Sequence, residues 1–137
     1  MDKVLSEDTA LEQFEIIEEY YDLEEPQDKD QKVAYNAIKG KLLKAIQKGR
    51  ITINVEGGLK ITQNLVGKYG DMEPFLIYGE LSGRAKKVMS KTSDNDHHGK
   101  IYLLLGALTG YGAKLIEELK GVDHVVAESL GLLFLMV

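Results

Sequence analysis

Apolar residues alternate with polar ones on both sides of a double glycine between positions 50 and 65. The alternating apolar residues are Ile51, Ile53, Val55, Leu59 and Ile61. Alternation rich in β-branched residues predicts an antiparallel β-hairpin. A three-residue loop over 56–58 sets Ile53 opposite Ile61 and gives the hairpin one apolar face, whereas a two-residue turn would mix its faces. We therefore predict a hairpin over 51–65 whose loop has Gly58 in a left-handed conformation.

Two stretches before the hairpin carry apolar residues at spacings of three and four, which predicts amphipathic helices. The first covers residues 9–23, presents carboxylates on its outer face, and is expected to be capped by Asp8 or Thr9. The second begins near Asp28 and ends at Gly49, with lysines outside its apolar stripe. The apolar stripes consist of Leu11, Phe14, Ile17 and Tyr21 in the first helix, and of Ala34, Ile38, Leu42 and Ile46 in the second.

After the hairpin, Gly67, Gly70 and Pro74 indicate a loop, and the short apolar run 75–78 predicts a third strand. A helix is expected from Leu81 or Ser82 to about residue 91. The loop 94–99 has acidic residues and a glycine at spacings found in calcium-binding EF-hands, but position 12 of that pattern is Leu105 instead of glutamate. We therefore predict a polar loop between two helices, and no metal site.

Residues 100–129 fit two different patterns. As helices, the leucines of 101–108 form a stripe that ends at Gly110, a short helix runs to Gly121, and Asp123 caps a last helix. As a β-α-β unit, residues 100–105 and 122–127 are strands. Gly106, Gly110 and Gly112 then form a GxxxGxG turn, with Glu128 as the ribose-binding acid, which resembles the cofactor loop of short-chain dehydrogenases. The chain after Lys100 is too short for the rest of such an enzyme, so we favour the helices.

Together these elements predict an α+β fold that is mainly helical, in a single domain over 1–137. Its parts are an acidic helical head (1–25), a basic amphipathic helix (26–49), a small antiparallel sheet (50–79) and a helical region (80–137).

Charge is distributed unevenly along this chain of net charge −5. Residues 1–25 contain ten acids and one lysine, whereas the remainder has sixteen basic and twelve acidic residues. There is no cysteine, and the N-terminus lacks the features of a signal peptide, so we expect a cytoplasmic protein, in the host cytoplasm if viral. The apolar C-terminal run LGLLFLMV falls far short of the ~20 residues that span a membrane, so no membrane association is expected.

The chain from about residue 50 to 135 resembles the tail assembly chaperones of tailed bacteriophages. The resemblance rests on the hairpin ITINVEGGLKITQNL, the run LLLGALTG, the segment AKLIEELKG, the aspartate at 123, and Phe134-Leu135. It implies a non-enzymatic role, in which the chain binds hydrophobic or helical segments of a tape-measure protein and tail tube subunits.

We expect such a partner segment to lie in a groove between helices and to contact aliphatic anchors. The candidate partner-binding residues are Leu104, Leu108, Leu115, Leu130, Leu133 and Phe134. No nucleophile and base form a recognisable pair, so we predict no enzyme activity and no cofactor. Two alternatives remain: a fragment that binds NAD(P) through Gly106–Gly112, and a nucleic-acid-associated regulator that uses the lysines of 32–50, although nucleic acid is the less expected partner. Homo-oligomers are expected if apolar residues of the last helix are exposed.

Overall fold

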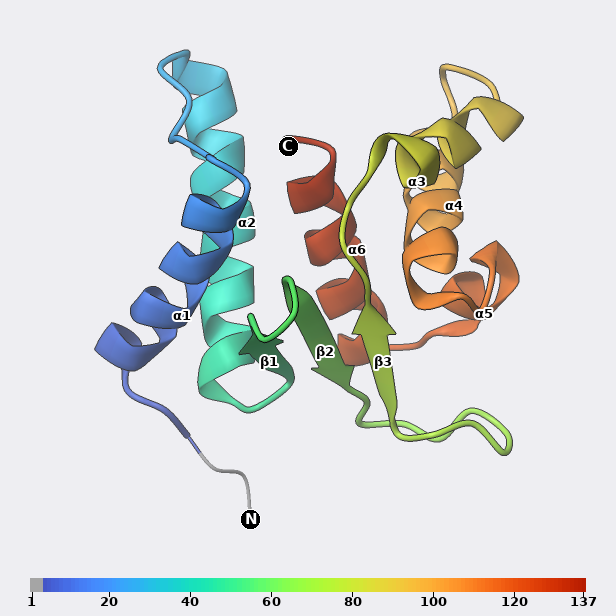
Figure 1. Cartoon of the computed structure of the whole chain (residues 1–137), viewed down its shortest axis with the longest axis horizontal. Coiled ribbons are helices and arrows are strands. Elements are labelled where there is room, and N and C mark those ends of the chain that lie inside the picture. Colours follow the sequence, from blue (N-terminus) through green and yellow to red (C-terminus); the bar gives the residue numbers. More distant parts are fainter. Residues whose placement is uncertain (1–3) are drawn as a thin grey trace.

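The computed structural model describes residues 4–137, in which helices pack on one face of a three-stranded antiparallel sheet (Figure 1). Its elements are α1 (Glu7–Tyr20), α2 (Lys29–Gln47), β1 (Ile51–Asn54), β2 (Lys60–Asn64), β3 (Phe75–Tyr78), α3 (Gly83–Lys87), the 3₁₀-helix η1 (Val88–Lys91), α4 (His97–Thr109), α5 (Ala113–Glu118) and α6 (Val122–Phe134). Two helices, then a sheet, then a helical region confirm the predicted α+β fold class.

The acidic helix α1 begins one turn earlier than its predicted caps allow. Its N-cap is Ser6, whose hydroxyl accepts a hydrogen bond from the Thr9 N–H at 3.1 Å. Capping by Asp8 or Thr9 is therefore wrong, since Ser6 satisfies the free amide and the acids fall in the first turn, where the helix dipole favours them. The buried face of α1 consists of Ala10, Phe14 and Ile17.

Helix α2 carries the basic segment, and α1 packs along it. Asp28 caps α2 as predicted, by accepting from the Gln31 N–H. Its buried stripe begins at Tyr35 instead of Ala34, because the Tyr35 hydroxyl donates to Glu18 of α1 at 2.6 Å. Burial and this hydrogen bond raise the pKa of Tyr35 above its usual value. The acidic head thus docks on the basic helix.

Gly40 occupies the interior of α2 on an exposed side, and a Cβ built there meets no atom within 4 Å. We expect Gly40→Ala to raise the free energy of unfolding by about 1 kcal/mol, because alanine favours the helix and displaces no neighbour. Thermal unfolding followed by circular dichroism should show a Tm about 3 °C higher. A Tm equal to or below that of the unsubstituted chain would contradict this expectation.

The sheet has the strand order β1-β2-β3, with both pairings antiparallel. Ile53 pairs with Ile61 and Ile51 with Gln63, which is the register that the three-residue loop predicts. Gly57 and Gly58 both have positive φ angles, at 71° and 116°. The third strand pairs with β2 over the predicted residues 75–78. Val55 departs from the predicted apolar face, since half of its surface is exposed.

One face of the sheet lies on helices and the other is open (Figure 1). Alternate residues of the three strands point inward, and the buried ones are Ile51, Ile61, Gln63, Leu76 and Tyr78. All of these except the polar Gln63 belong to one hydrophobic core that also includes buried side chains of α1, α2, α4, α5 and α6. In Figure 1, α6 passes behind the sheet, with α1 and α2 on one side of it and α3, α4 and α5 on the other.

The C-terminal region follows the helical pattern and not the β-α-β pattern. Residues 100–105 lie in α4 and residues 122–127 lie in α6, so the two expected strands of the alternative are wrong. Gly110 ends α4 in a left-handed conformation with φ of 79°, as a C-terminal glycine does. Three of the four positions in the predicted helical stripe, Ile101, Leu104 and Leu105, pack into the core, because their spacing matches 3.6 residues per turn.

Candidate protein-binding surface

The six side chains predicted to bind a partner lie in two different environments. Four of them pack in the core and are at most 1% exposed: Leu104, Leu130, Leu133 and Phe134. The other two, Leu108 and Leu115, are partly buried at the surface. They line separate hollows, one beside α3 and one between the loop 68–70 and α5. The structure therefore does not bring the six together as one exposed patch.

The glycines of the GxxxGxG pattern serve helix packing. Gly106 is buried in α4, where a Cβ would overlap the backbone of Gly112 and Ala113. The N–H groups of Gly110 and Gly112 both donate to the Gly106 carbonyl, at 2.9 and 3.1 Å. These glycines let the chain fold back tightly from α4 into α5, and no parallel strand accompanies them within residues 4–137. The dinucleotide-binding geometry that the alternative requires is not formed.

Asp123 is the most deeply buried carboxylate of the described chain, at 2% exposure. It is not the cap of the last helix, as the sequence predicts, because Gly121 occupies that position. The carboxylate instead accepts hydrogen bonds from the N–H groups of Val66 and Gly67, at 2.8 and 2.9 Å, and from the Tyr69 hydroxyl at 2.7 Å. Asp123 therefore fastens the loop after β2 to the start of α6.

A second set of hydrogen bonds continues from Asp123 into the sheet. The Gln63 side chain donates to the Asp123 carbonyl at 2.8 Å and accepts from the Tyr78 hydroxyl at 2.6 Å. Burial raises the pKa of Tyr78 above its usual value, so the hydroxyl stays protonated and able to donate. Every buried side-chain N or O atom of residues 4–137 has a hydrogen-bond partner within the chain. These buried polar groups therefore stabilise the fold through hydrogen bonds within the chain.

The loop 94–99 caps a helix. Asp96 is the N-cap of α4 and accepts from the Gly99 N–H at 3.0 Å and from the Thr92 hydroxyl at 2.6 Å. These two donors, Thr92 first, hold the pKa of the Asp96 carboxyl below its usual value. Residues 92–96 form a polar loop between two helices, as predicted, but His97, His98 and Gly99 lie in the first turn of α4, because Asp96 caps the helix before them.

Two histidines and a glutamate meet where α4 faces α6. His124 Nε2 lies 3.0 Å from Tyr102 Oη and 3.5 Å from Glu128 Oε2, and His98 Nδ1 lies 3.7 Å from the same carboxylate oxygen. No group of three His, Asp or Glu side chains among residues 4–137 has an arrangement that could hold a metal ion. The cluster links the two helices at the surface.

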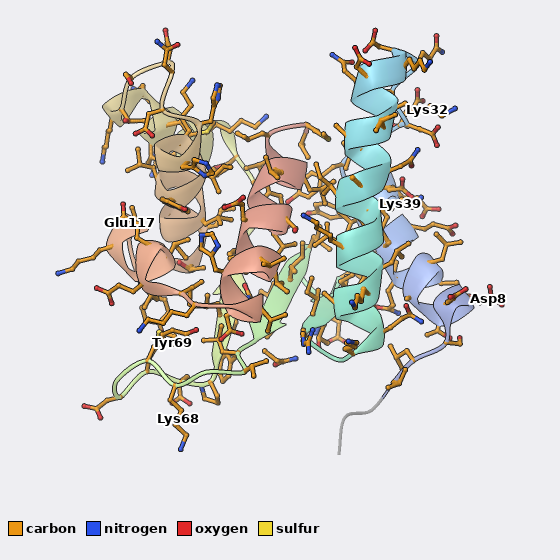
Figure 2. All side chains as sticks on the ribbon, turned by 180° about the vertical axis from the view of Figure 1, so that it is seen from behind. Asp8, Lys32, Lys39, Lys68, Tyr69 and Glu117 are labelled. Carbon is orange, nitrogen blue, oxygen red and sulfur yellow. The ribbon has the colours of Figure 1, made fainter. Side chains whose placement is uncertain are left out.

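A surface without internal partners lies along α2 and α6, which run side by side. We call it the α2–α6 face and define it by Lys41, Lys44, Arg50, Val122, Val125 and Leu132. Five of these six line a hollow of about 250 Å³ between the two helices, and Leu132 follows two turns along α6. Val125 is 46% exposed and Leu132 is 36% exposed. Viewed from this side, no segment crosses in front of α2 and α6 (Figure 2).

The basic residues of the α2–α6 face are not neutralised within the described chain. Lys41, Lys44 and Arg50 have no carboxylate oxygen of residues 4–137 within 4.0 Å, whereas two lysines on the α1 side of α2 pair with glutamates. Among residues 4–137, no acidic side chain lines the hollow. The face therefore combines exposed aliphatic side chains with three unpaired positive charges.

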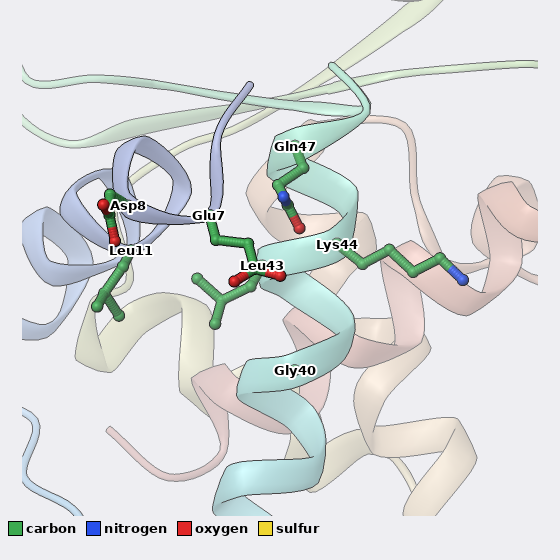
Figure 3. Close-up of a pocket in the computed structure, with 7 residues that line it drawn as sticks. All are labelled: Glu7, Asp8, Leu11, Gly40, Leu43, Lys44 and Gln47. Carbon is green, nitrogen blue, oxygen red and sulfur yellow. The ribbon is translucent and has the colours of Figure 1, made fainter. Parts of the chain in front are cut away.

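A neighbouring groove separates α1 from α2 and has a volume of about 360 Å³. Glu7, Asp8 and Leu11 line one side, and the exposed Gly40 leaves its floor open (Figure 3). Figure 3 shows the Lys44 side chain extended away from the two acids. Lys44 lines both hollows, but its side chain extends away from the acids of the α1–α2 groove. We therefore count its positive charge with the α2–α6 face.

Comparisons with protein-family models, with curated proteins and with solved structures give no match. Among residues 4–137, no helix combines the length and apolar character needed to cross a bilayer.

Sequence reasoning missed the apolar half of the α2–α6 face, although a signal was present. The stripe of α6 that packs inward includes Val126, Leu130 and Leu133. Val122, Val125 and Leu132 are apolar too, yet they fall outside that stripe. A helix that is apolar on two faces buries both when another element packs on each. Within residues 4–137, only one of the two apolar faces of α6 is buried.

Proposed function

We propose that this chain is a non-enzymatic factor that binds an apolar segment of another protein, acting as a tail assembly chaperone in the cytoplasm of the host cell. The family resemblance of residues 50–135 names the candidate partners, a tape-measure protein and tail tube subunits. The observation that supports the proposal most is the α2–α6 face, on which aliphatic side chains stand exposed beside unpaired cations.

This surface has the composition of an interaction site. Isolated exposed apolar residues are normal on any protein, but grouped ones with a polar rim mark sites of association. Val122 and Val125 line the hollow together, and Lys41 with Arg50 lies at its border. Binding a partner there would remove the aliphatic groups from water and leave the cations at the rim, where they steer association.

The polar clusters of the described chain also favour binding over catalysis. Asp123 and Gln63 satisfy backbone and tyrosine groups inside the fold, and the His124 cluster joins two helices. Catalysis by a nucleophile requires a reactive side chain within hydrogen-bond reach of a base that faces a substrate-sized cavity. The α1–α2 groove and the hollow of the α2–α6 face are instead lined by aliphatic, basic and carboxylate side chains and by Gln47.

Co-expression with a tape-measure protein tests the proposal. We expect the soluble yield of that protein to rise several-fold when the chain is present, and the two to co-purify as a complex of defined mass. An unrelated aggregation-prone protein serves as the control, and its yield should stay constant. An unchanged yield of the tape-measure protein, without a complex, would refute the proposed function.

A second candidate, nucleic-acid binding, is favoured by one observation. Lys41, Lys44, Lys48 and Arg50 are close in sequence near the end of α2 and have no carboxylate within 4.0 Å in the described chain. Binding through these cations would weaken steeply as salt rises, because counterions are released from phosphates. Titration of labelled DNA and RNA at two salt concentrations distinguishes the two candidates.

A further inference from the structure

We infer that the segment bound by the α2–α6 face is an acidic amphipathic helix, with aliphatic residues along one side and glutamates or aspartates beside them. This inference rests on the proposed function, since it names the partner chemistry of the same surface. It draws on three features of the chain: the spacing of the exposed aliphatics, the unpaired cations, and the way in which α1 already packs on α2.

The spacing of the aliphatic side chains suits a helix. Val125 and Leu132 are seven residues apart on α6, which corresponds to two turns or about 10 Å along the axis. A partner helix presents its own anchors at positions i, i+3 or i+4, and i+7, which repeat over the same distance. Lying along the seam between α2 and α6, such a helix would cover both aliphatic side chains at once.

The three cations of the α2–α6 face indicate that the partner helix is acidic. Lys41 and Lys44 are on α2 and Arg50 follows its end, so all three lie on the same flank of the exposed valines. Their aliphatic stems can extend the apolar surface while their charged ends stay in water. A neutral or basic helix would leave these charges unpaired or repelled, whereas an acidic one would pair with them at the rim.

Helix α1 packs on α2 within the chain in the way that we expect the partner helix to bind. It is an acidic amphipathic helix that buries Phe14 and Ile17 against the opposite side of α2. Its Glu18 lies 3.6 Å from Lys39, whose Nζ also lies 5.2 Å from the centre of the Phe14 ring. Apolar anchors beside one glutamate–lysine pair thus hold an acidic helix on α2. The α2–α6 face offers exposed aliphatic residues and cations on the other side of α2.

Two other occupants fit less well. Nucleic-acid sites for single strands use aromatic side chains on which bases stack, and the α2–α6 face has aliphatic ones. A second copy that used the same face in a two-fold dimer would bring Lys41, Lys44 and Arg50 of both copies together, and their like charges would repel.

A synthetic peptide probe tests the inference on the full chain. The probe is a labelled helix of about 15 residues built from leucine, alanine and glutamate, with leucines along one side; its control has lysine in place of every glutamate. We expect fluorescence anisotropy to detect saturable binding of the acidic peptide, weaker at higher salt, and no binding of the basic peptide. Equal binding of the two peptides would overturn the inference.

Charge reversal locates the site. The double variant Lys41→Glu/Lys44→Glu should weaken binding of the acidic peptide at least about tenfold, and Val125→Asp/Leu132→Asp should do the same. The matched control Lys60→Glu/Lys91→Glu changes two exposed lysines elsewhere by the same net charge and should bind as the unsubstituted chain does. Circular dichroism of each variant checks that it is folded. Undiminished binding by the first two variants would overturn the inference.

The same variants separate this inference from the proposed function. If the unsubstituted chain raises the soluble yield of a tape-measure protein and Lys41→Glu/Lys44→Glu raises it equally, the function stands and the inference fails. If the unsubstituted chain has no effect on that yield, the proposed function fails, whatever the peptide does. Sedimentation of the chain alone, and competition by DNA, report a second copy or nucleic acid as the occupant, and either result would overturn the inference.

Discussion

Replacing Asp123 by alanine is expected to lower the free energy of unfolding by about 3 kcal/mol and the Tm by about 10 °C. The buried carboxylate accepts three hydrogen bonds, from the N–H groups of Val66 and Gly67 and from the Tyr69 hydroxyl. Alanine leaves these three donors without their acceptor, and hydrogen bonds to a charged group are the more costly ones to lose. Urea denaturation and calorimetry measure the change.

Asp94→Ala is the matched control for this substitution. The Asp94 side chain is fully exposed, and its contact with Lys100 is 3.9 Å long, so its removal should change the free energy of unfolding by less than about 0.5 kcal/mol. The loss of unfolding free energy for Asp123→Asn should lie between those for Asp94→Ala and Asp123→Ala. One side-chain oxygen of asparagine still accepts hydrogen bonds, whereas its NH₂ group faces other donors. A loss below about 1 kcal/mol for Asp123→Ala would show that the loop does not depend on this carboxylate.

Gly106→Ala is expected to destabilise the chain by about 3 kcal/mol through a steric conflict. The added methyl group would overlap the backbone of residues 112 and 113, and the Gly112 carbonyl oxygen would lie 2.8 Å from it. A flexible side chain could rotate away, but here the obstacle is main chain, so α4 and α5 must separate. Separation would break the hydrogen bond from the Gly112 N–H to the Gly106 carbonyl. Chemical denaturation and amide exchange at 110–113 measure both effects.

Gly40→Ala provides the comparison, because it is the same substitution inside another helix. Helix propensity favours alanine at both positions, so the difference in sign between the two variants isolates the steric term. If Gly106→Ala were as stable as the unsubstituted chain, the close approach of α4 and α5 would not exist in solution.

Local patterns were sufficient to predict the hairpin and some of the helix ends. The register of β1 and β2 follows from the requirement that apolar residues share one face, and Ile53 does pair with Ile61. Asp28 caps the beginning of α2 through its side chain, and Gly110 ends α4 through its left-handed backbone, as predicted. These features depend on residues within a few positions of one another, which a sequence displays directly.

Contacts between distant residues could not be predicted in this way. Asp123 looks like a cap because it precedes an apolar run, but its partners lie more than fifty positions earlier in the loop after β2. Leu104 and Leu130 form the apolar stripes that suggested partner anchors, yet the same stripes are what a helix needs to pack on its own core. Only the arrangement of α2 beside α6 reveals which aliphatic residues remain uncovered.

The amide of Gln63 has a consequence for how the strands align. A hairpin in which β2 slips by two residues would keep its alternation, so apolar patterning alone tolerates it. Such a slip would carry Gln63 away from the Tyr78 hydroxyl and the Asp123 carbonyl, and each unpaired group would cost about 1–3 kcal/mol. A single polar side chain in an apolar layer thus favours one strand register over others that the neighbouring apolar side chains would accept equally well.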